Sequence, residues 1–161
     1  MSDALVPATN SGAIEPDAHV LHVVFRVADA DYALPADEVL QMETYTGATV
    51  VPGAQSFVAG IIQLRGRVIP VVDLRLRFGL PKGEITLDSR VVVAEHAGRT
   101  VALIADSARE VVRIPRSAIK PPPKLAELGA RGFVRHVAQL DARMILILDF
   151  AKVIGEETID V

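Results

Sequence analysis

The sequence predicts an all-β protein with minor α content, built as two small barrels packed against each other. Short apolar runs recur at intervals of about 8–12 residues with turn residues between them, as in small sandwiches and barrels. Patterns with a helical period are scarce, and a hairpin followed by a capped turn occurs twice. The chain has 161 residues, 50% hydrophobic and 4% aromatic, which is enough for one or two cores of mainly aliphatic side chains.

The first strand is predicted at residues 19–27. Its odd-numbered positions are apolar, and this alternation is typical of a half-buried strand. These positions are Leu21, Val23, Phe25 and Val27. Residues 29–31 then supply a turn, and Pro35 ends the second strand because proline cannot donate to a ladder. Residues 39–44 are predicted to be extended or a short helix, and residues 47–55 a loop.

The segment from residue 61 to 72 is the most informative part of the sequence. Arg65 and Gly66 separate two apolar runs. A glycine at the second turn position adopts positive φ at little cost, so the segment predicts a hairpin. Pro70 lacks an N–H donor, which places its strand at a sheet edge or beside a bulge. Asp73 is then expected to cap one short helical turn.

Residues 82–88 form a polar connector, and the sequence predicts a boundary there between subdomains 19–82 and 83–155. Further strands are expected beyond it because apolar runs alternate with turn residues. The predicted elements are strands at 91–94 and 100–105 about a turn at 96–98, a strand at 111–114, an extended segment at 121–123, strands at 133–140 and 143–148, and a final capped turn at 149–155.

The two clearest hairpins share six identical residues at a spacing of 76 positions, which we call the sequence echo. The identical pairs are Gln63 and Gln139, Leu64 and Leu140, Arg67 and Arg143, Ile69 and Ile145, Asp73 and Asp149, and Gly79 and Gly155. Two explanations are open: any hairpin that leads into a capped turn has such a composition, or the chain contains a true repeat. In both cases the same supersecondary unit is expected twice.

The sequence contains no recognisable catalytic, nucleotide or metal motif. It has no Cys, which excludes thiolate nucleophiles, disulfides and Cys-containing metal sites. Glycine-rich phosphate loops, HExxH, EF-hand and GxSxG patterns are also missing from it. His19 and His22 are the closest histidines, but their odd spacing places them on opposite faces of a strand. No cofactor and no metal is therefore predicted.

Three carboxylates, Asp73, Asp106 and Asp149, each end an apolar strand run, a position where many enzymes hold a catalytic acid. Capping and turn formation are the favoured interpretation, because two of the three precede an apolar turn that a glycine closes. None has an obvious acid/base partner in the sequence. The chain is therefore predicted not to be an enzyme.

One basic cluster lies between Arg65 and Lys82, where five basic residues accompany a single carboxylate. It predicts a solvated face, a protein interface, or a nucleic-acid site on a small barrel. The last is disfavoured, because such barrels stack bases on aromatic side chains and only Phe78 lies nearby. The formal net charge of −3 also provides no field that attracts a polyanion.

The run from Phe57 to Arg75, FVAGIIQLRGRVIPVVDLR, strongly resembles the signature of CheW-like domains. That signature has a glycine, an Asn-Leu-Arg-Gly element, an apolar run with a proline, and Asp-Leu-Arg, in this order. Weaker similarity extends over residues 19–155. The resemblance implies two packed SH3-like five-stranded β-barrels. It also implies a stand-alone, non-enzymatic adaptor, because the chain has no receiver domain and no kinase elements.

The resemblance further implies two protein partners, the regulatory domain of the histidine kinase CheA and the cytoplasmic tip of chemoreceptors, with no nucleic acid. Arg65 and Gly66 would lie on the face that contacts both partners, and Val39 on the receptor side. The residues expected at protein contacts are Val39, Gln41, Phe57, Gly60, Arg65, Gly66 and Arg67. Flagellar chemotaxis and another chemosensory pathway, such as pilus motility, both remain open as the output.

Two residues depart from the family pattern. Gln63 stands where asparagine is usual, and Gln41 where the family often has a glutamate able to pair with Arg65. Without that carboxylate, Arg65 is expected to be free for an acidic group of a partner or to be paired elsewhere. The departures suggest a divergent paralogue whose receptor or kinase lies outside the main chemotaxis set.

Both ends of the chain are predicted to be tails. Residues 1–18 hold three acidic and no basic residues and have no apolar period, so a disordered N-terminal tail is expected. Residues 156–161 are expected to form a C-terminal tail. Neither a signal-peptide pattern nor an apolar run of about 18 residues is found, so the protein is expected in the cytoplasm, without membrane insertion, recruited to receptor arrays.

Overall fold

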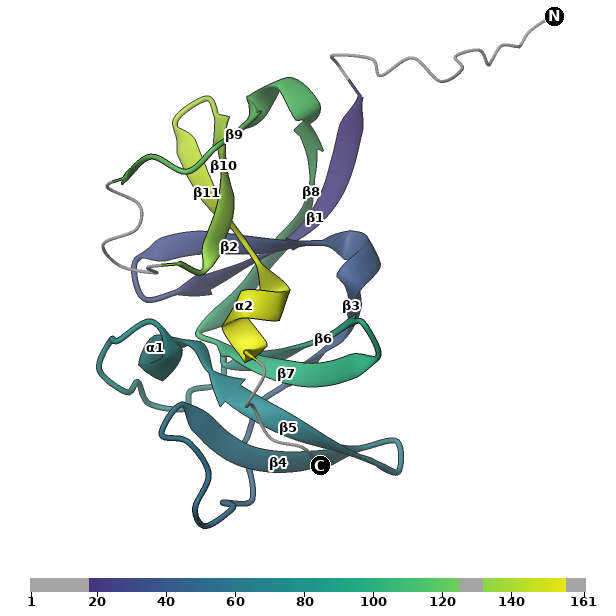
Figure 1. Ribbon diagram of the computed structural model, residues 1–161, viewed down its shortest axis with the longest axis vertical. Coiled ribbons are helices and arrows are strands. Elements are labelled where there is room, and N and C mark those ends of the chain that lie inside the picture. Colours follow the sequence, from purple (N-terminus) through teal and green to yellow (C-terminus); the bar gives the residue numbers. More distant parts are fainter. Residues whose placement is uncertain (1–17, 125–131, 156–161) are drawn as a thin grey trace, which may run out of the picture.

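The computed structural model describes residues 18–124 and 132–155, and its strands form two sheets stacked along the long axis of the molecule (Figure 1). Sheet A has the strand order β8-β1-β2-β11-β10-β9, and sheet B the order β3-β6-β7-β5-β4. The strands of sheet A are β1 (His19–Val27), β2 (Ala30–Pro35), β8 (Ser107–Pro115), β9 (Ile119–Lys120), β10 (Val134–Leu140) and β11 (Arg143–Leu148). The strands of sheet B are β3 (Val39–Thr44), β4 (Val58–Leu64), β5 (Arg67–Asp73), β6 (Arg90–His96) and β7 (Arg99–Ala105). The short helical turns are η2 (Ala36–Glu38), α1 (Leu74–Arg77), η3 (Arg116–Ala118) and α2 (Phe150–Ile154).

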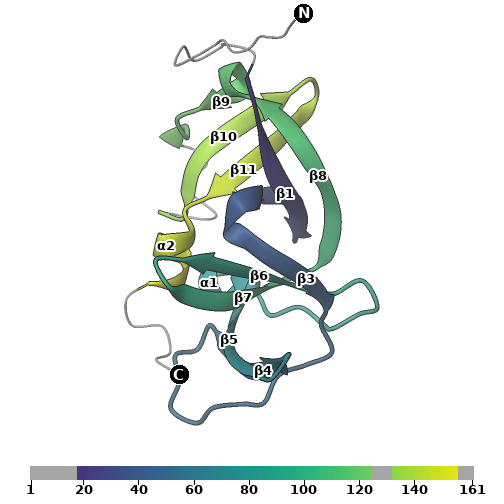
Figure 2. The same ribbon diagram turned by 90° about the vertical axis from the view of Figure 1, so that its right-hand side faces the viewer.

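Each sheet curls around a core of its own, which gives barrel A and barrel B (Figure 2). The core of barrel A consists of Val24, Ala33, Ile114, Ala138, Ile145 and Ile147. The core of barrel B consists of Tyr45, Ile69, Val71, Val91, Val93 and Ala102. A third and larger cluster, the inter-barrel core, packs the two sheets together and includes Phe25, Leu34, Leu74, Phe78, Leu103 and Phe150. The all-β prediction with two packed barrels is confirmed. Sheet B has the five strands expected, whereas sheet A has six because the two-residue strand β9 pairs with β10.

The two barrels do not divide the chain at the predicted boundary near residue 82. Barrel B is one continuous segment, residues 39–105, whereas barrel A combines residues 19–35 with residues 107–148. The physical reason is a pair of crossings: β3 follows β2 but pairs with β6, and β8 follows β7 but pairs with β1. The polar connector at 82–88 is thus a loop within barrel B. The predicted tails are residues 1–18 and 156–161, and apart from Ala18 they lie outside the described residues.

Strand β1 does not present the single apolar face that its sequence predicts. A bulge between Val24 and Phe25 shifts the register against β8, so both of these neighbours are 0% exposed. Before the bulge the even-numbered residues, including His22, point into barrel A, and Leu21 is 49% exposed. The predicted face of odd-numbered residues therefore holds only for Phe25 and Val27.

The hairpin of β4 and β5 forms as predicted. Of the two positions predicted for Pro70, a sheet edge or a site beside a bulge, the structure has the second. Strand β5 is not an edge strand, since it lies between β4 and β7. Its parallel pairing with β7 covers only Val71–Asp73, so Pro70 lies just before this ladder. The register shift between Val58 and Gly60 on β4 lies opposite the next residues of β5. The bulge is confirmed, and the edge position is wrong.

The sequence echo corresponds to a repeated structural unit. The hairpin of β4 and β5 leads into α1, and that of β10 and β11 leads into α2. The Asp73 N–H donates to the Phe57 carbonyl at 2.8 Å, and the Asp149 N–H donates to the Phe133 carbonyl at 2.8 Å. Each aspartate also accepts a backbone N–H three residues further on, at 3.3 and 3.2 Å. Both predicted caps are therefore confirmed.

The other predicted elements are close to those observed. The turns at 97–98 and 141–142 join antiparallel strands as expected, and residues 39–44 form a strand. The first turn falls at Ala28 and Asp29, slightly before the predicted residues 29–31. Strand β8 is longer than predicted, because its pairing with β1 continues through the bulge.

A candidate docking surface on barrel B

The turn between β4 and β5 projects from one end of barrel B (Figure 1). Arg65 has φ +50° and Gly66 has φ +80°. Both turn residues are therefore left-handed, as a type I′ turn in a two-residue hairpin requires. Both residues are exposed. The left-handed conformation is unfavourable for any residue that has a Cβ, and Ala97 and Asp141 adopt it at the same position of their hairpin turns.

The guanidinium of Arg65 makes no ion pair or hydrogen bond with any described residue. Arg67, also exposed, donates from Nη2 to Thr100 Oγ1 at 3.2 Å, which holds it against β7. The hairpin therefore presents one fixed and one unpaired guanidinium. An unpaired, exposed guanidinium is suited to a carboxylate on another protein, because its planar donors match a carboxylate at two points.

Gln41 lies on β3 and donates from Nε2 to Glu43 Oε2 at 2.9 Å. Glu43 lines a surface recess together with Gln63 and Leu64, directly before the Arg65 turn. The carboxylate absent at Gln41 is thus present two positions along the same strand. Sequence reasoning missed Glu43, although residues two apart on a strand share a face and this rule points to it.

Val39 and Leu40 lie where β3 bulges against β6. Val39 is half-buried and packs against the inter-barrel core, so only part of it is available to a partner. Leu40 is 48% exposed because the bulge leaves it without a cross-strand partner. Leu40 is not among the predicted contact residues, and alternation alone does not reveal the bulge that exposes it.

Phe57 and Gly60 have structural contacts that explain their presence without a partner. The guanidinium of Arg77 stacks 4.1 Å above the ring of Phe57 and 4.8 Å from the ring of Phe133. A Cβ on Gly60 would overlap the Thr49 carbonyl oxygen, so only glycine fits there. A contact of Phe57 or Gly60 with another protein stays a prediction.

Three of the five basic side chains of the cluster have contacts within the fold, and Arg75 is paired with a carboxylate. Arg75 holds Asp106 at 2.7 Å from Nη2 and 3.0 Å from Nε, and the Ala28 N–H donates to the same carboxylate at 2.7 Å. Burial alone would raise the pKa of Asp106, but these hydrogen bonds and the charge of Arg75 outweigh it and lower the pKa. With Arg77 stacked as well, Arg65 and Lys82 are the cluster members without a side-chain partner among the described residues.

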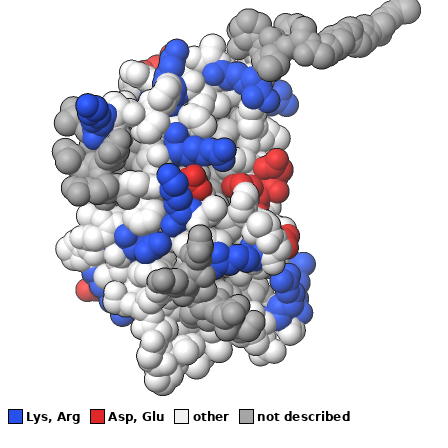
Figure 3. Space-filling view, in the orientation of Figure 1, with Lys and Arg blue, Asp and Glu red and all other residues white. Residues whose placement is uncertain are grey.

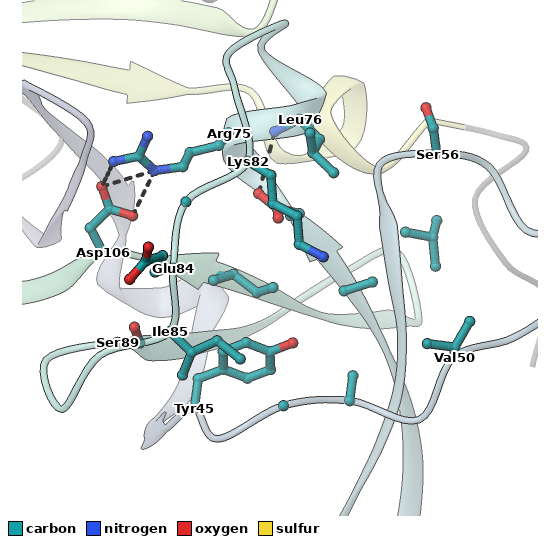
Figure 4. A pocket seen from close by; sticks show the side chains of 17 residues that line it. Tyr45, Val50, Ser56, Arg75, Leu76, Lys82, Glu84, Ile85, Ser89 and Asp106 are labelled. Atoms are coloured by element: carbon teal, nitrogen blue, oxygen red, sulfur yellow. Dashed lines mark hydrogen bonds and ion pairs between the residues drawn. The ribbon is translucent and has the colours of Figure 1, made fainter.

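A pocket of about 380 Å³ lies beside this ion pair, between the loop before β4 and the loop after α1 (Figure 4). Val50 and Ile85 line it and are 75% and 53% exposed. The Lys82 side chain extends across the pocket between these loops (Figure 4). The pocket also contains three carboxylates, of which Asp106 pairs with Arg75 and Asp73 caps α1.

The charges and helices of the described residues give no sign of other common functions. On the face shown in Figure 3, Lys and Arg form separate groups with Asp and Glu between some of them, and no continuous basic stripe is visible. Within residues 18–124 and 132–155, no group of three or more His, Asp or Glu side chains is placed to hold a metal ion. No helix in the part of the chain that the structure describes is long and apolar enough to cross a membrane.

Comparisons with known proteins agree with this architecture. The chain is 32% identical to the chemotaxis protein CheW of Rhizobium meliloti (strain 1021) over 135 residues, 84% of this chain and 87% of that protein. It is 33% identical to protein FrzA of Myxococcus xanthus over 133 residues, 81% of this chain and 82% of that protein. The crystal structure of the scaffolding protein TtCheW from Thermoanaerobacter tengcongensis superposes with a TM-score of 0.80 at 33% identity, over 89% of this chain and 97% of that one. The family model described as CheW-like domain matches residues 21–158, and the chain therefore belongs to the CheW-like domain family.

Proposed function

We propose that this chain is a non-enzymatic adaptor that couples the cytoplasmic tips of chemoreceptors to the regulatory domain of the histidine kinase CheA. Membership of the CheW-like family and the names of the relatives, chemotaxis proteins and a scaffolding protein, support this function. The structural contacts of the three carboxylates support a role without catalysis, because Asp73 and Asp149 cap helical turns and Asp106 pairs with Arg75. The adaptor acts in the cytoplasm at receptor arrays.

The observation that carries the proposal is the unpaired guanidinium of Arg65 on a left-handed turn. An L-residue with a Cβ pays about 1 kcal/mol for this conformation, and asparagine or glycine would relieve part of that cost. Ala97 and Asp141 adopt the same conformation in other hairpin turns, so the exposed guanidinium without a partner, and not the backbone, favours a contact outside the chain. The surface we assign consists of Val39, Leu40, Gln41, Glu43, Arg65, Gly66 and Arg67.

The test is a binding titration of the purified protein against two partners, the CheA regulatory domain and a receptor fragment. Both are taken from genes that neighbour the gene of this protein. Arg65→Glu should weaken at least one of these complexes by roughly tenfold or more, because a like charge meets the acidic group of the partner. The midpoint of thermal unfolding should stay within about 2 °C of the wild type, since exposed residues contribute little to stability.

Two control variants separate a lost contact from a damaged fold. Arg113→Glu changes the same charge on an exposed arginine of β8 and should leave both affinities unchanged. Arg65→Asn suits the left-handed turn and should bind weakly while unfolding at the same or a higher temperature. Wild-type affinity of Arg65→Glu for both partners would contradict the proposal, as would failure of the wild-type protein to bind either one.

A second candidate pathway has one specific observation in its favour. FrzA of Myxococcus xanthus is as similar to this chain as the CheW proteins are. We therefore propose a chemosensory system other than flagellar chemotaxis, such as one that controls pilus motility, as the alternative output. Deleting the gene and scoring swimming and surface motility separately distinguishes the two.

A further inference from the structure

A second cavity, of about 420 Å³, lies on barrel A and shares no residue with the docking surface on barrel B. It opens between β1, η2, η3 and β10. Its walls include the apolar side chains of Val20, Ile119, Ile147 and Leu148. Most of the remaining lining is polar or charged, which the barrel fold does not require. The inference drawn from it is independent of the adaptor function.

His22 supplies a buried ring to this cavity. Only 3% of the residue is exposed, and its Nδ1 lies 3.1 Å from the Val20 carbonyl oxygen. A carbonyl can only accept, so Nδ1 carries the hydrogen and Nε2 is left with a lone pair. Among the described residues Nε2 has no hydrogen-bond partner. The interior of the cavity therefore offers one hydrogen-bond acceptor that is not used.

The rest of the lining consists of two cations, one acid, a second histidine and two prolines: Arg116, Arg135, Glu38, His136, Pro35 and Pro121. Arg116 on η3 and Arg135 on β10 are exposed, line the cavity, and form no side-chain ion pair or hydrogen bond with any described residue. Glu38 is the acid, and it is engaged with His96 Nδ1 at 3.5 Å. The cavity thus holds two guanidinium groups that form no hydrogen bond or ion pair with a described residue, although the charge of Arg135 acts to lower the pKa of Glu38.

We propose that this cavity binds a phosphate monoester. Such a group is a monoanion or dianion near neutral pH, because its second pKa is about 6. Its protonated oxygen donates to His22 Nε2, and its remaining oxygens accept from Arg116 and Arg135. The organic part of the ester lies on the apolar wall. A sulfate ester has similar shape but no proton to donate, so it satisfies the arginines and leaves Nε2 unpaired.

The first test compares phenyl phosphate with phenyl sulfate by calorimetry or by amide shifts of the full chain at pH 6.5. Phenyl phosphate should bind about tenfold more tightly, which is the worth of one hydrogen bond to a charged group. Arg116→Gln and Arg135→Gln should weaken both ligands, and Arg113→Gln, which changes an arginine outside the cavity, should weaken neither. Equal affinity for the two esters, or no binding of either, overturns the proposal.

A second variant keeps the test valid if a change at His22 disturbs the fold. His22→Gln keeps a polar side chain at this position, and His22→Leu removes it. A folded His22→Leu protein should bind the two esters equally. The charges of Asp37 and His136 act on the pKa of His22, so the ring carbon-bound proton shifts of His22 itself are used to show whether the ring has changed charge. Preserved discrimination by a folded His22→Leu protein contradicts the assignment of Nε2.

The ester can be a small metabolite or a phosphorylated side chain of another protein. Inorganic phosphate and a phosphoserine peptide distinguish these sources. Binding of the peptide about tenfold more tightly than the inorganic ion supports a phosphoprotein. Similar affinities support a small molecule. Both results require the wild-type arginines, and insensitivity to Arg116→Gln and Arg135→Gln rejects the site for either source.

Discussion

His22 is an ionisable side chain buried inside barrel A, and its charge must respond to the pH of the solution. Burial lowers the pKa of His22, the Val20 carbonyl and the charge of Asp37 act to raise it, and His136 lowers it further. The pKa in the folded state lies below the unfolded value of about 6.5. Below the unfolded value, the unfolded chain binds the proton more readily than the folded chain does. The free energy of unfolding therefore falls as the pH decreases.

The expected result is a free energy of unfolding that is steady above about pH 7.5 and declines from about pH 6.5 downward. Urea titrations at a series of pH values measure it. His22→Gln should flatten this part of the curve, because the side chain no longer titrates. A matched control is His19→Gln, which replaces an exposed histidine on the same strand. Identical pH curves for wild type and His22→Gln would contradict the prediction.

At the scale of residues, the sequence predicts roles well where the role is local. The caps at Asp73 and Asp149 follow from residues three positions away, and the Arg65 turn follows from its glycine neighbour. Asp106 is predicted to serve a turn, but its main partner Arg75 is 31 residues away. No sequence pattern predicts that two side chains this far apart in the chain are in contact. The contact depends on how the two sheets stack.

Gly60 shows how one residue determines the geometry of an element. It has φ +144°, and it follows the bulge of β4, where Thr49 and Ile61 exchange two backbone hydrogen bonds of 2.9 Å. A Cβ at Gly60 would overlap the Thr49 oxygen that accepts one of these bonds. The glycine therefore allows the loop before β4 to cover the strand.

Gly60→Ala is expected to lower the free energy of unfolding by about 3 kcal/mol or more, because the loop must move and the bridge must break. Urea denaturation measures the loss. Gly53→Ala is the matched control, since Gly53 also has positive φ but a Cβ added there would meet no atom within 4 Å. It should cost about 1 kcal/mol. Similar losses in the two variants would show that conformation, and not the close approach, restricts residue 60.

At the scale of elements, the sequence predicts nearly every strand because turn residues separate the apolar runs. The prediction fails where an extra residue enters a strand. The bulges in β1–β8 and β3–β6 reverse the face of the residues that follow, yet no residue type marks them. Leu21 precedes the first bulge and does not share the buried face of Phe25 and Val27, and Leu40 is the residue without a cross-strand partner at the second; both are exposed.

Arg77 joins the two barrels at the point where their repeated units meet. Its Nε donates to the Val153 carbonyl at 2.7 Å, and its Nη2 donates to the Lys152 carbonyl at 3.2 Å. Its guanidinium also stacks between Phe57 and Phe133, the equivalent residues of the two units. Burial lowers the pKa of Arg77, yet arginine remains charged at every pH at which proteins fold.

Arg77→Ala should lower the free energy of unfolding by about 2–4 kcal/mol, because two carbonyls and two aromatic faces lose a partner at once. Arg77→Lys should recover only a small part, since an ammonium cannot reach both carbonyls and stack flat. Spin labels on β4 and β10 should report a broader distance distribution between the barrels. An unchanged distribution in Arg77→Ala would show that the inter-barrel core alone fixes their orientation.

At the scale of the molecule, the sequence predicts two barrels because it contains two similar hairpin units. It does not predict how the chain divides between them. Consecutive strands pair or lie together in about two-thirds of cases, and a boundary near residue 82 follows from that tendency. Here the connections from β2 to β3 and from β7 to β8 cross between the barrels. Which barrel a strand joins depends on which sheet edges remain open once both sheets form.

The split of barrel A along the chain has a consequence during protein synthesis. The hairpin of β1 and β2 leaves the ribosome first, but its partners β8 and β11 follow only after the whole of barrel B. The gap of about 70 residues corresponds to roughly 4–14 s at about 5–20 residues per second. During this time Val24 and Phe25 lack their final neighbours. Once all residues up to 105 have left the ribosome, the nascent chain should therefore have a folded barrel B and an N-terminal hairpin that proteases and chaperones can still reach.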